Sequence, residues 1–77
     1  MSKYPFEITP ADEGIMAAAY DDCMARGFGD DDSLDVIGWA IRQEVAPIDA
    51  TDEQIALAAY LFYLAEIKAR NSSEGGA

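Results

Sequence analysis

Signals that start and stop helices divide this 77-residue chain into three segments. Thr9 followed by Pro10 is typical of an N-cap and a first helical residue, and Gly27 is typical of a left-handed C-cap. Pro47 ends a second segment because the residue before a proline avoids helical backbone angles. Thr51 begins a capping box of the form T-x-x-Q, which opens a third segment. The predicted helices span about 10–26, 33–45 and 52–70, the second beginning at Asp32 or Ser33.

Apolar residues recur within the first two segments at the spacing of a helix face. They are Ile15, Met16, Ala19, Tyr20 and Cys23 in the first segment, and Leu34, Ile37, Ile41 and Val45 in the second. No segment shows the period-two alternation of a strand. The predicted fold is therefore all-α. It is a compact three-helix bundle over residues 9–70, with an extended arm at residues 1–8 and a disordered tail at residues 71–77.

The third predicted helix is apolar all round, which indicates that other helices surround it or that it lies in an oligomer interface. Its three faces are Ile55, Ala58 and Phe62; Leu57, Leu61 and Leu64; and Tyr60, Tyr63 and Ile67. Two short partner helices cannot easily cover three faces. One functional alternative is therefore a homodimeric structural or adaptor protein, in which Tyr60, Phe62 and Tyr63 pair across a two-fold axis.

One cysteine, Cys23, and no histidine restrict the chemistry of this chain. An internal disulfide and a zinc site of histidine and cysteine are both excluded. Nucleophile–base pairs need a histidine or a suitably placed lysine, and Lys3 and Lys68 lie in the arm and at a helix end. A calcium loop that begins at Asp30 would have aliphatic residues at its fifth and twelfth positions. We therefore expect no enzyme activity, no cofactor and no bound metal.

The longest apolar run covers residues 55–65, and its 11 residues are fewer than the ~20 that a membrane span needs. The first ten residues contain no apolar core of a signal peptide. We expect a cytoplasmic protein that does not contact a membrane.

Fifteen aspartate and glutamate residues oppose five lysine and arginine residues, which gives a net charge of −10. This charge argues against direct binding to nucleic acid and favours a partner with a basic surface. The acids are densest in the stretch GFGDDDSLD, at residues 27–35. Trp39 lies off the apolar stripe of its helix, so we expect it to anchor a partner. The predicted partner-binding residues are Asp21, Asp22, Asp30, Asp31, Asp32, Asp35, Val36 and Trp39.

The segment Asp32-Ser33-Leu34-Asp35 at a helix start resembles the D-S-L motif of acyl carrier proteins. In that family the serine receives a phosphopantetheine arm, so the resemblance implies modification at Ser33. The family has a long loop between its first two helices, whereas the first predicted helix here continues to Arg26. The plainer alternative is that Asp32 or Ser33 caps the second helix.

The size, charge and helical build of the chain resemble those of small acidic inhibitors encoded by phages, among them anti-CRISPR proteins and other DNA mimics. The resemblance rests on no sequence motif. It implies a non-enzymatic inhibitor whose carboxylates replace a row of phosphates in a basic site. The partner would be a nucleic-acid-binding protein or complex, such as a CRISPR effector, in the cytoplasm of the host cell if a phage encodes the protein. This is the leading functional hypothesis.

Overall fold

The computed structural model describes residues 3–75, and that range contains three α-helices and no strand. Helix α1 spans Pro10–Arg26, α2 spans Asp30–Glu44 and α3 spans Asp52–Gly75. The prediction of an all-α three-helix bundle is confirmed.

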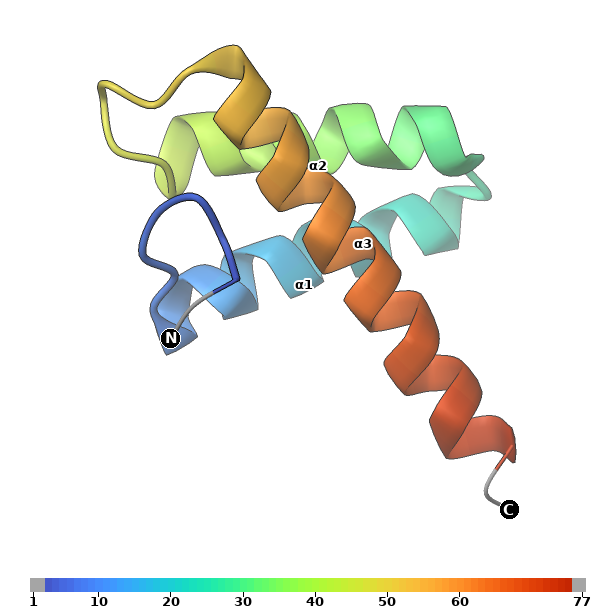
Figure 1. The fold of residues 1–77 in the computed structure, drawn as a ribbon. Helices are drawn as coiled ribbons and strands as arrows, with labels where there is room; N and C mark the ends of the chain where they lie inside the picture. Colours follow the sequence, from blue (N-terminus) through green and yellow to red (C-terminus); the bar gives the residue numbers. More distant parts are fainter. Residues whose placement is uncertain (1–2, 76–77) are drawn as a thin grey trace.

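Helices α1 and α2 lie side by side and antiparallel, because only a short turn at residues 27–29 connects them (Figure 1). Helix α3 crosses both of them diagonally (Figure 1). Helix α2 packs extensively on each of the other two, whereas α1 and α3 contact each other only slightly. Helix α2 is therefore the element that connects the bundle.

The predicted signals at three helix ends are confirmed. The Thr9 side chain accepts a hydrogen bond from the Asp12 N–H, and the Asp12 carboxylate accepts one from the Thr9 N–H, both at 3.1 Å. Thr51 and Gln54 form the same reciprocal pair at the start of α3, at 3.1 and 2.9 Å. Gly27 ends α1 with a φ of 73°, a left-handed angle at which any side chain would be strained.

Helix α2 begins at Asp30, which is earlier than the sequence predicts. The prediction that Asp32 or Ser33 caps this helix is wrong, because the N-cap is Gly29, which makes no side-chain hydrogen bond. The Gly29 carbonyl accepts a hydrogen bond from the Ser33 N–H at 2.9 Å. The first helical turn therefore contains Asp30, Asp31 and Asp32, where carboxylates interact favourably with the helix dipole.

Helix α3 continues to Gly75, so the predicted disordered tail is wrong for residues 71–75. Residues 76 and 77 lie outside the described residues. The last proline in the chain is Pro47, and Gly75 is the first glycine after Gly38. Nothing in the sequence therefore interrupts the hydrogen bonding of α3 before that point.

The N-terminal arm is bent at residues 3–6, where it departs from the predicted extended form; residues 1 and 2 lie outside the described residues. Tyr4, Phe6 and Ile8 are partly buried and pack against the core. Burial raises the pKa of Tyr4, and the charges of Glu13 in α1 and Glu66 in α3 raise it further. The arm therefore bends because its apolar side chains bury themselves near α1 and α3.

The core takes side chains from all three helices. Ile37 and Ile41, from the predicted stripe of α2, are fully buried. The rings of Tyr20 and Tyr63 lie 5.7 Å apart and are tilted by 50°, an arrangement typical of favourable aromatic pairs. The buried hydrophobic residues are Met16, Tyr20, Cys23, Ile37, Ala40, Ile41, Ile55, Ala58, Ala59, Phe62 and Tyr63.

Candidate partner-binding surface

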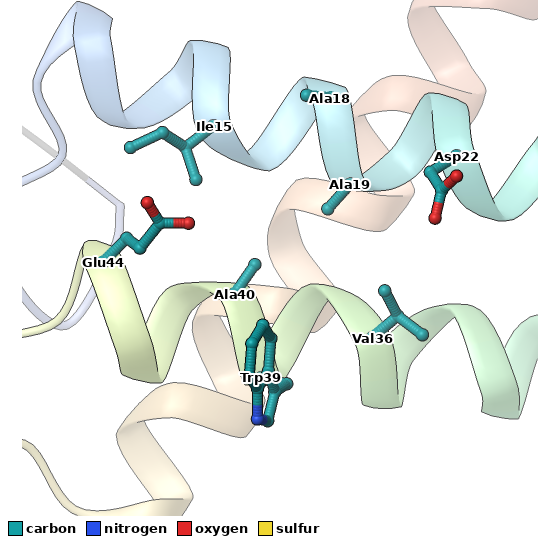
Figure 2. Close-up of a pocket in the computed structure, with 8 residues that line it drawn as sticks. All are labelled: Ile15, Ala18, Ala19, Asp22, Val36, Trp39, Ala40 and Glu44. Carbon is teal, nitrogen blue, oxygen red and sulfur yellow. The ribbon is translucent and has the colours of Figure 1, made fainter.

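A shallow apolar groove of about 370 Å³ runs between α1 and α2 (Figure 2). In Figure 2 the ribbon of α3 passes behind these helices, so the groove opens on the side away from α3. Alanines from both helices leave this space open because their side chains are too short to fill it. The lining residues are Ile15, Ala18, Ala19, Asp22, Val36, Trp39, Ala40 and Glu44.

Carboxylates stand at the two ends of this groove. Figure 2 shows Glu44 at the end near Ile15 and Asp22 at the end near Val36. Asp22 forms an exposed ion pair with Arg26 at 3.0 Å. Glu44 forms no ion pair within residues 3–75. The groove therefore combines an apolar centre with negative ends.

Trp39 lies on the rim of the groove, and 64% of its surface is exposed. It also borders a more polar depression between α2 and α3. The prediction that Trp39 lies outside the core is confirmed. Val36, the other predicted anchor residue, is partly buried and lines the same groove. An exposed indole beside an apolar groove is a feature that binding hot spots favour.

Part of the groove was not predictable from helix periodicity. The predicted core face of the first helix includes Ile15 and Ala19, yet both are only partly buried and line the groove. Glu44, at the last position of α2, has no sequence signal that distinguishes it from other exposed acids. The run Ala17-Ala18-Ala19 was the available signal, because small residues facing a second helix leave a hollow.

Three of the predicted partner-binding aspartates are free of partners in the described part of the chain. Asp31, Asp32 and Asp35 are exposed and form no ion pair there. Asp32, Val36 and Trp39 follow one another at spacings of four and three residues, so they share one face of α2. Asp32 therefore lies on the same side of α2 as Val36 and the exposed Trp39.

Asp21 has a partner within the chain. It forms an ion pair with Arg70 of α3, and the same guanidinium lies 3.3 Å from a carboxylate oxygen of Glu66. The guanidinium carbon of Arg70 also lies 4.6 Å from the centre of the Tyr20 ring, within the range of a cation–π interaction. Asp21 therefore helps to connect α1 with α3.

Asp30 also has a partner within the chain. The Tyr63 hydroxyl donates a hydrogen bond to Asp30 Oδ1 at 2.5 Å. This hydrogen bond and the burial of the ring raise the pKa of Tyr63 to about 12. The pair joins the first turn of α2 to α3. Asp30 is therefore part of the fold as well as part of the acidic surface.

Ser33 is fully buried, which argues against the acyl-carrier interpretation. A serine that receives a phosphopantetheine arm must be reachable by the enzyme that attaches it. The Ser33 side chain instead lies close to the Cys23 thiol and the Tyr63 hydroxyl, where it influences the pKa of both groups. Its oxygen makes no hydrogen bond of normal geometry with any described group. The burial of Ser33 therefore disfavours the modification that the resemblance implies.

The replacement Ser33→Ala is expected to leave the free energy of unfolding unchanged or to raise it by up to about 1 kcal/mol. The reason is that a buried hydroxyl without a hydrogen bond is costly to take out of water. Chemical denaturation of both proteins measures the difference. A loss of more than about 1 kcal/mol would show that the hydroxyl is hydrogen-bonded in solution.

The predicted dimer interface of Tyr60, Phe62 and Tyr63 is wrong for two of its three residues. Phe62 and Tyr63 are each only 6% exposed, because both side chains point into the core of a single chain. Tyr60 is 50% exposed and lies on the outer face of α3 with Leu57 and Leu64, which are 47% and 44% exposed. The apolar surface of α3 therefore consists of faces that are buried in the bundle and one outer face that is exposed.

The described residues include few groups that could act as a nucleophile or bind a metal ion. Burial raises the pKa of the Cys23 thiol, which favours its protonated form over the nucleophilic thiolate. No cluster of three or more metal-ligating side chains occurs among the described residues. None of the helices in that range has the length and apolarity required to cross a membrane. The groove with Trp39 and the neighbouring carboxylates is the strongest candidate site.

Comparison with known proteins gave no match to a family model, to a curated protein or to a solved structure.

Proposed function

We propose that this protein is a non-enzymatic inhibitor that binds a basic surface on a nucleic-acid-binding protein or complex, such as a CRISPR effector. Its carboxylates take the place of nucleic-acid phosphates there. The observation that carries the proposal is the position of exposed Trp39. It lies between an apolar groove and the unpaired carboxylates of Asp31, Asp32 and Asp35.

The charge distribution supports a basic partner. Each of the three arginines is already paired with a carboxylate: Arg26 with Asp22, Arg42 with Asp52, and Arg70 with Asp21 and Glu66. The net charge of −10 is therefore carried largely by carboxylates that form no ion pair within the described residues. Such a surface attracts a basic protein, speeds its association and makes binding sensitive to salt.

The groove adds a contact that a phosphate backbone cannot offer. An apolar side chain of the partner enters between α1 and α2 beside Trp39, where the groove excludes water. Lysine or arginine side chains of the partner then pair with Asp22 and Glu44 at the groove ends. In this proposal the carboxylates attract the partner, and burial of the Trp39 side chain slows its dissociation. The proposed place of action is the cytoplasm, that of the host cell if a phage encodes the protein.

The test is a triple variant in which Asp31, Asp32 and Asp35 become asparagine. Tagged wild-type protein captures partners from a cell lysate, and mass spectrometry identifies them. Purified partner is then loaded with labelled nucleic acid and titrated with each protein. We expect the wild-type protein to displace the nucleic acid, and both the triple variant and Trp39→Ala to be at least about ten-fold weaker, a loss of about 1.4 kcal/mol.

A matched control neutralises Glu7, Glu13 and Asp49, three exposed acids that do not line the groove. This control changes the net charge by the same amount and is expected to compete nearly as well as the wild-type protein. If the two triple variants compete equally, the effect is one of total charge and the proposed surface is wrong. If partner, nucleic acid and wild-type protein form a ternary complex, the inhibitor proposal is wrong.

A further inference from the structure

The outer face of α3 is an exposed apolar stripe in an otherwise acidic molecule. Leu57, Tyr60 and Leu64 are each between 44% and 50% exposed, and Leu61 between them is partly buried. Along a helix these four residues follow one another at spacings of three, one and three positions, so they lie on one side. Extended in both directions, the stripe reaches Glu53 and Lys68, its only charged residues.

The spacing of the residues in the stripe is symmetric about a point between Tyr60 and Leu61. Leu57 precedes Tyr60 by three positions, and Leu64 follows Leu61 by three. Glu53 precedes Tyr60 by seven positions, and Lys68 follows Leu61 by seven. An antiparallel second copy of the helix would therefore meet this face in register. A two-fold axis requires this kind of self-complementary surface.

We propose that two copies of the protein associate through this face of α3, with the two helices antiparallel and the axis between Tyr60 and Leu61. Leu57 then packs against the partner's Leu64, and Tyr60 packs against the partner's Leu61. Glu53 pairs with the partner's Lys68 at each end of the interface. The apolar centre supplies most of the attraction, and the end charges fix the direction of the helices.

The net charge of −10 on each copy opposes association, but the interface itself is neutral because Glu53 and Lys68 balance. Added salt screens the repulsion between copies, so it should tighten the dimer. The same salt should weaken binding of a basic partner at the groove. The groove opens on the side away from α3, so the dimer leaves it accessible (Figure 2). This inference does not depend on the proposed function.

Sedimentation equilibrium of the purified protein tests whether the dimer exists. We expect the mass to rise from 8.3 kDa towards twice that value, with a dissociation constant on the order of 100 μM, as for a small interface. The constant should fall when sodium chloride rises from about 50 mM to about 500 mM. A mass that stays at 8.3 kDa up to about 1 mM protein, ten times that constant, overturns the proposal.

Two matched variants test which face is used. Leu64→Glu places a carboxylate opposite the partner's Leu57 and is expected to weaken the dimer at least about ten-fold. Ile48→Glu adds the same charge in the loop before α3, where Ile48 is fully exposed, and is expected to change the constant less than about two-fold. Circular dichroism confirms that both variants fold. Equal effects of the two variants would show that the dimer uses another surface.

A zero-length carbodiimide cross-link tests the direction of the helices. Glu53 and Lys68 are 15 positions apart on one helix, a distance of about 22 Å at 1.5 Å per residue, so they cannot be joined within one chain. A Glu53–Lys68 cross-link found by mass spectrometry would therefore join two copies. Glu53→Lys and Lys68→Glu should each abolish it, and the double variant should restore it. A dimer without this cross-link overturns the antiparallel arrangement.

Discussion

The replacement Ile41→Ala is expected to lower the free energy of unfolding by about 3 to 4 kcal/mol. Ile41 is fully buried, and it belongs to the helix that packs on both of the others. Removing three methyl or methylene carbons there loses apolar burial and leaves a cavity that a small bundle cannot easily close. A 77-residue domain has a total stability of roughly 4–12 kcal/mol, so this loss is a large fraction of the whole.

Thermal and chemical denaturation measure this effect, and a loss of this size should lower the melting temperature by about 15 °C or more. Ile48→Ala is the matched control, because it makes the same chemical change at a fully exposed residue. We expect the control to change the stability by less than about 0.5 kcal/mol. Similar losses for the two variants would contradict the burial of the α2 stripe.

Raising the pH through the range from 10 to about 12 is expected to remove about 3 kcal/mol of stability through Tyr63 alone. The folded-state pKa of Tyr63 lies above its unfolded value of 10.0, because the protonated hydroxyl donates to Asp30 and the ring is buried. The folded protein therefore holds this proton more tightly than the unfolded chain. The resulting stability is complete below pH 10 and is lost as the pH rises through the folded pKa.

The variant Tyr63→Phe isolates this contribution. It should be less stable than the wild-type protein at neutral pH by about 1 to 3 kcal/mol, because it loses a hydrogen bond to a charged carboxylate. This difference in the free energy of unfolding should shrink above about pH 10, where the Tyr63 hydroxyl of the wild-type protein begins to lose its proton-linked stabilisation. Cys23 and Tyr4, whose pKa values are also raised, titrate in both proteins and cancel in the difference.

Chemical denaturation between about pH 8 and about pH 12.5 measures both curves. Tyr60→Phe is the matched control on the same helix, because Tyr60 is half exposed and lies outside the core cluster of buried residues. Its curve should run parallel to that of the wild-type protein. A gap for Tyr63→Phe that stays constant up to the highest pH would contradict the raised pKa of Tyr63.

Local signals in the sequence predicted most of the fold. The capping box at Thr9, the glycine at residue 27 and the capping box at Thr51 each depend on residues within a few positions, and all three are confirmed. The start of α2 was harder because Asp30, Asp31 and Asp32 suit both a cap and a first helical turn. The three aspartates form the first helical turn because Gly29 takes the extended N-cap conformation, and glycine has no side chain that would signal this.

Long-range contacts were outside the reach of sequence patterns. Ser33 adjoins a charged loop in the sequence, yet in the structure it lies beside Cys23 and Tyr63 on two other helices. The ion pair of Asp21 with Arg70 joins positions 49 residues apart. The three-sided apolarity of α3 predicted that one of its faces would stay uncovered by the bundle, but only the packing identified which faces the bundle itself covers.

Because α2 packs on both other helices, removing it would leave α1 and α3 without most of their packing contacts. The backbones of α1 and α3 come close at few positions, and the two helices meet mainly through the Tyr20–Tyr63 rings and the Asp21–Arg70 ion pair, so neither alone covers the apolar face of the other once α2 is gone. A fragment that ends at the turn after α1, or one that begins at α3, would leave its apolar stripe in water. Neither of these fragments is therefore expected to fold independently, and the bundle is expected to unfold as one cooperative unit.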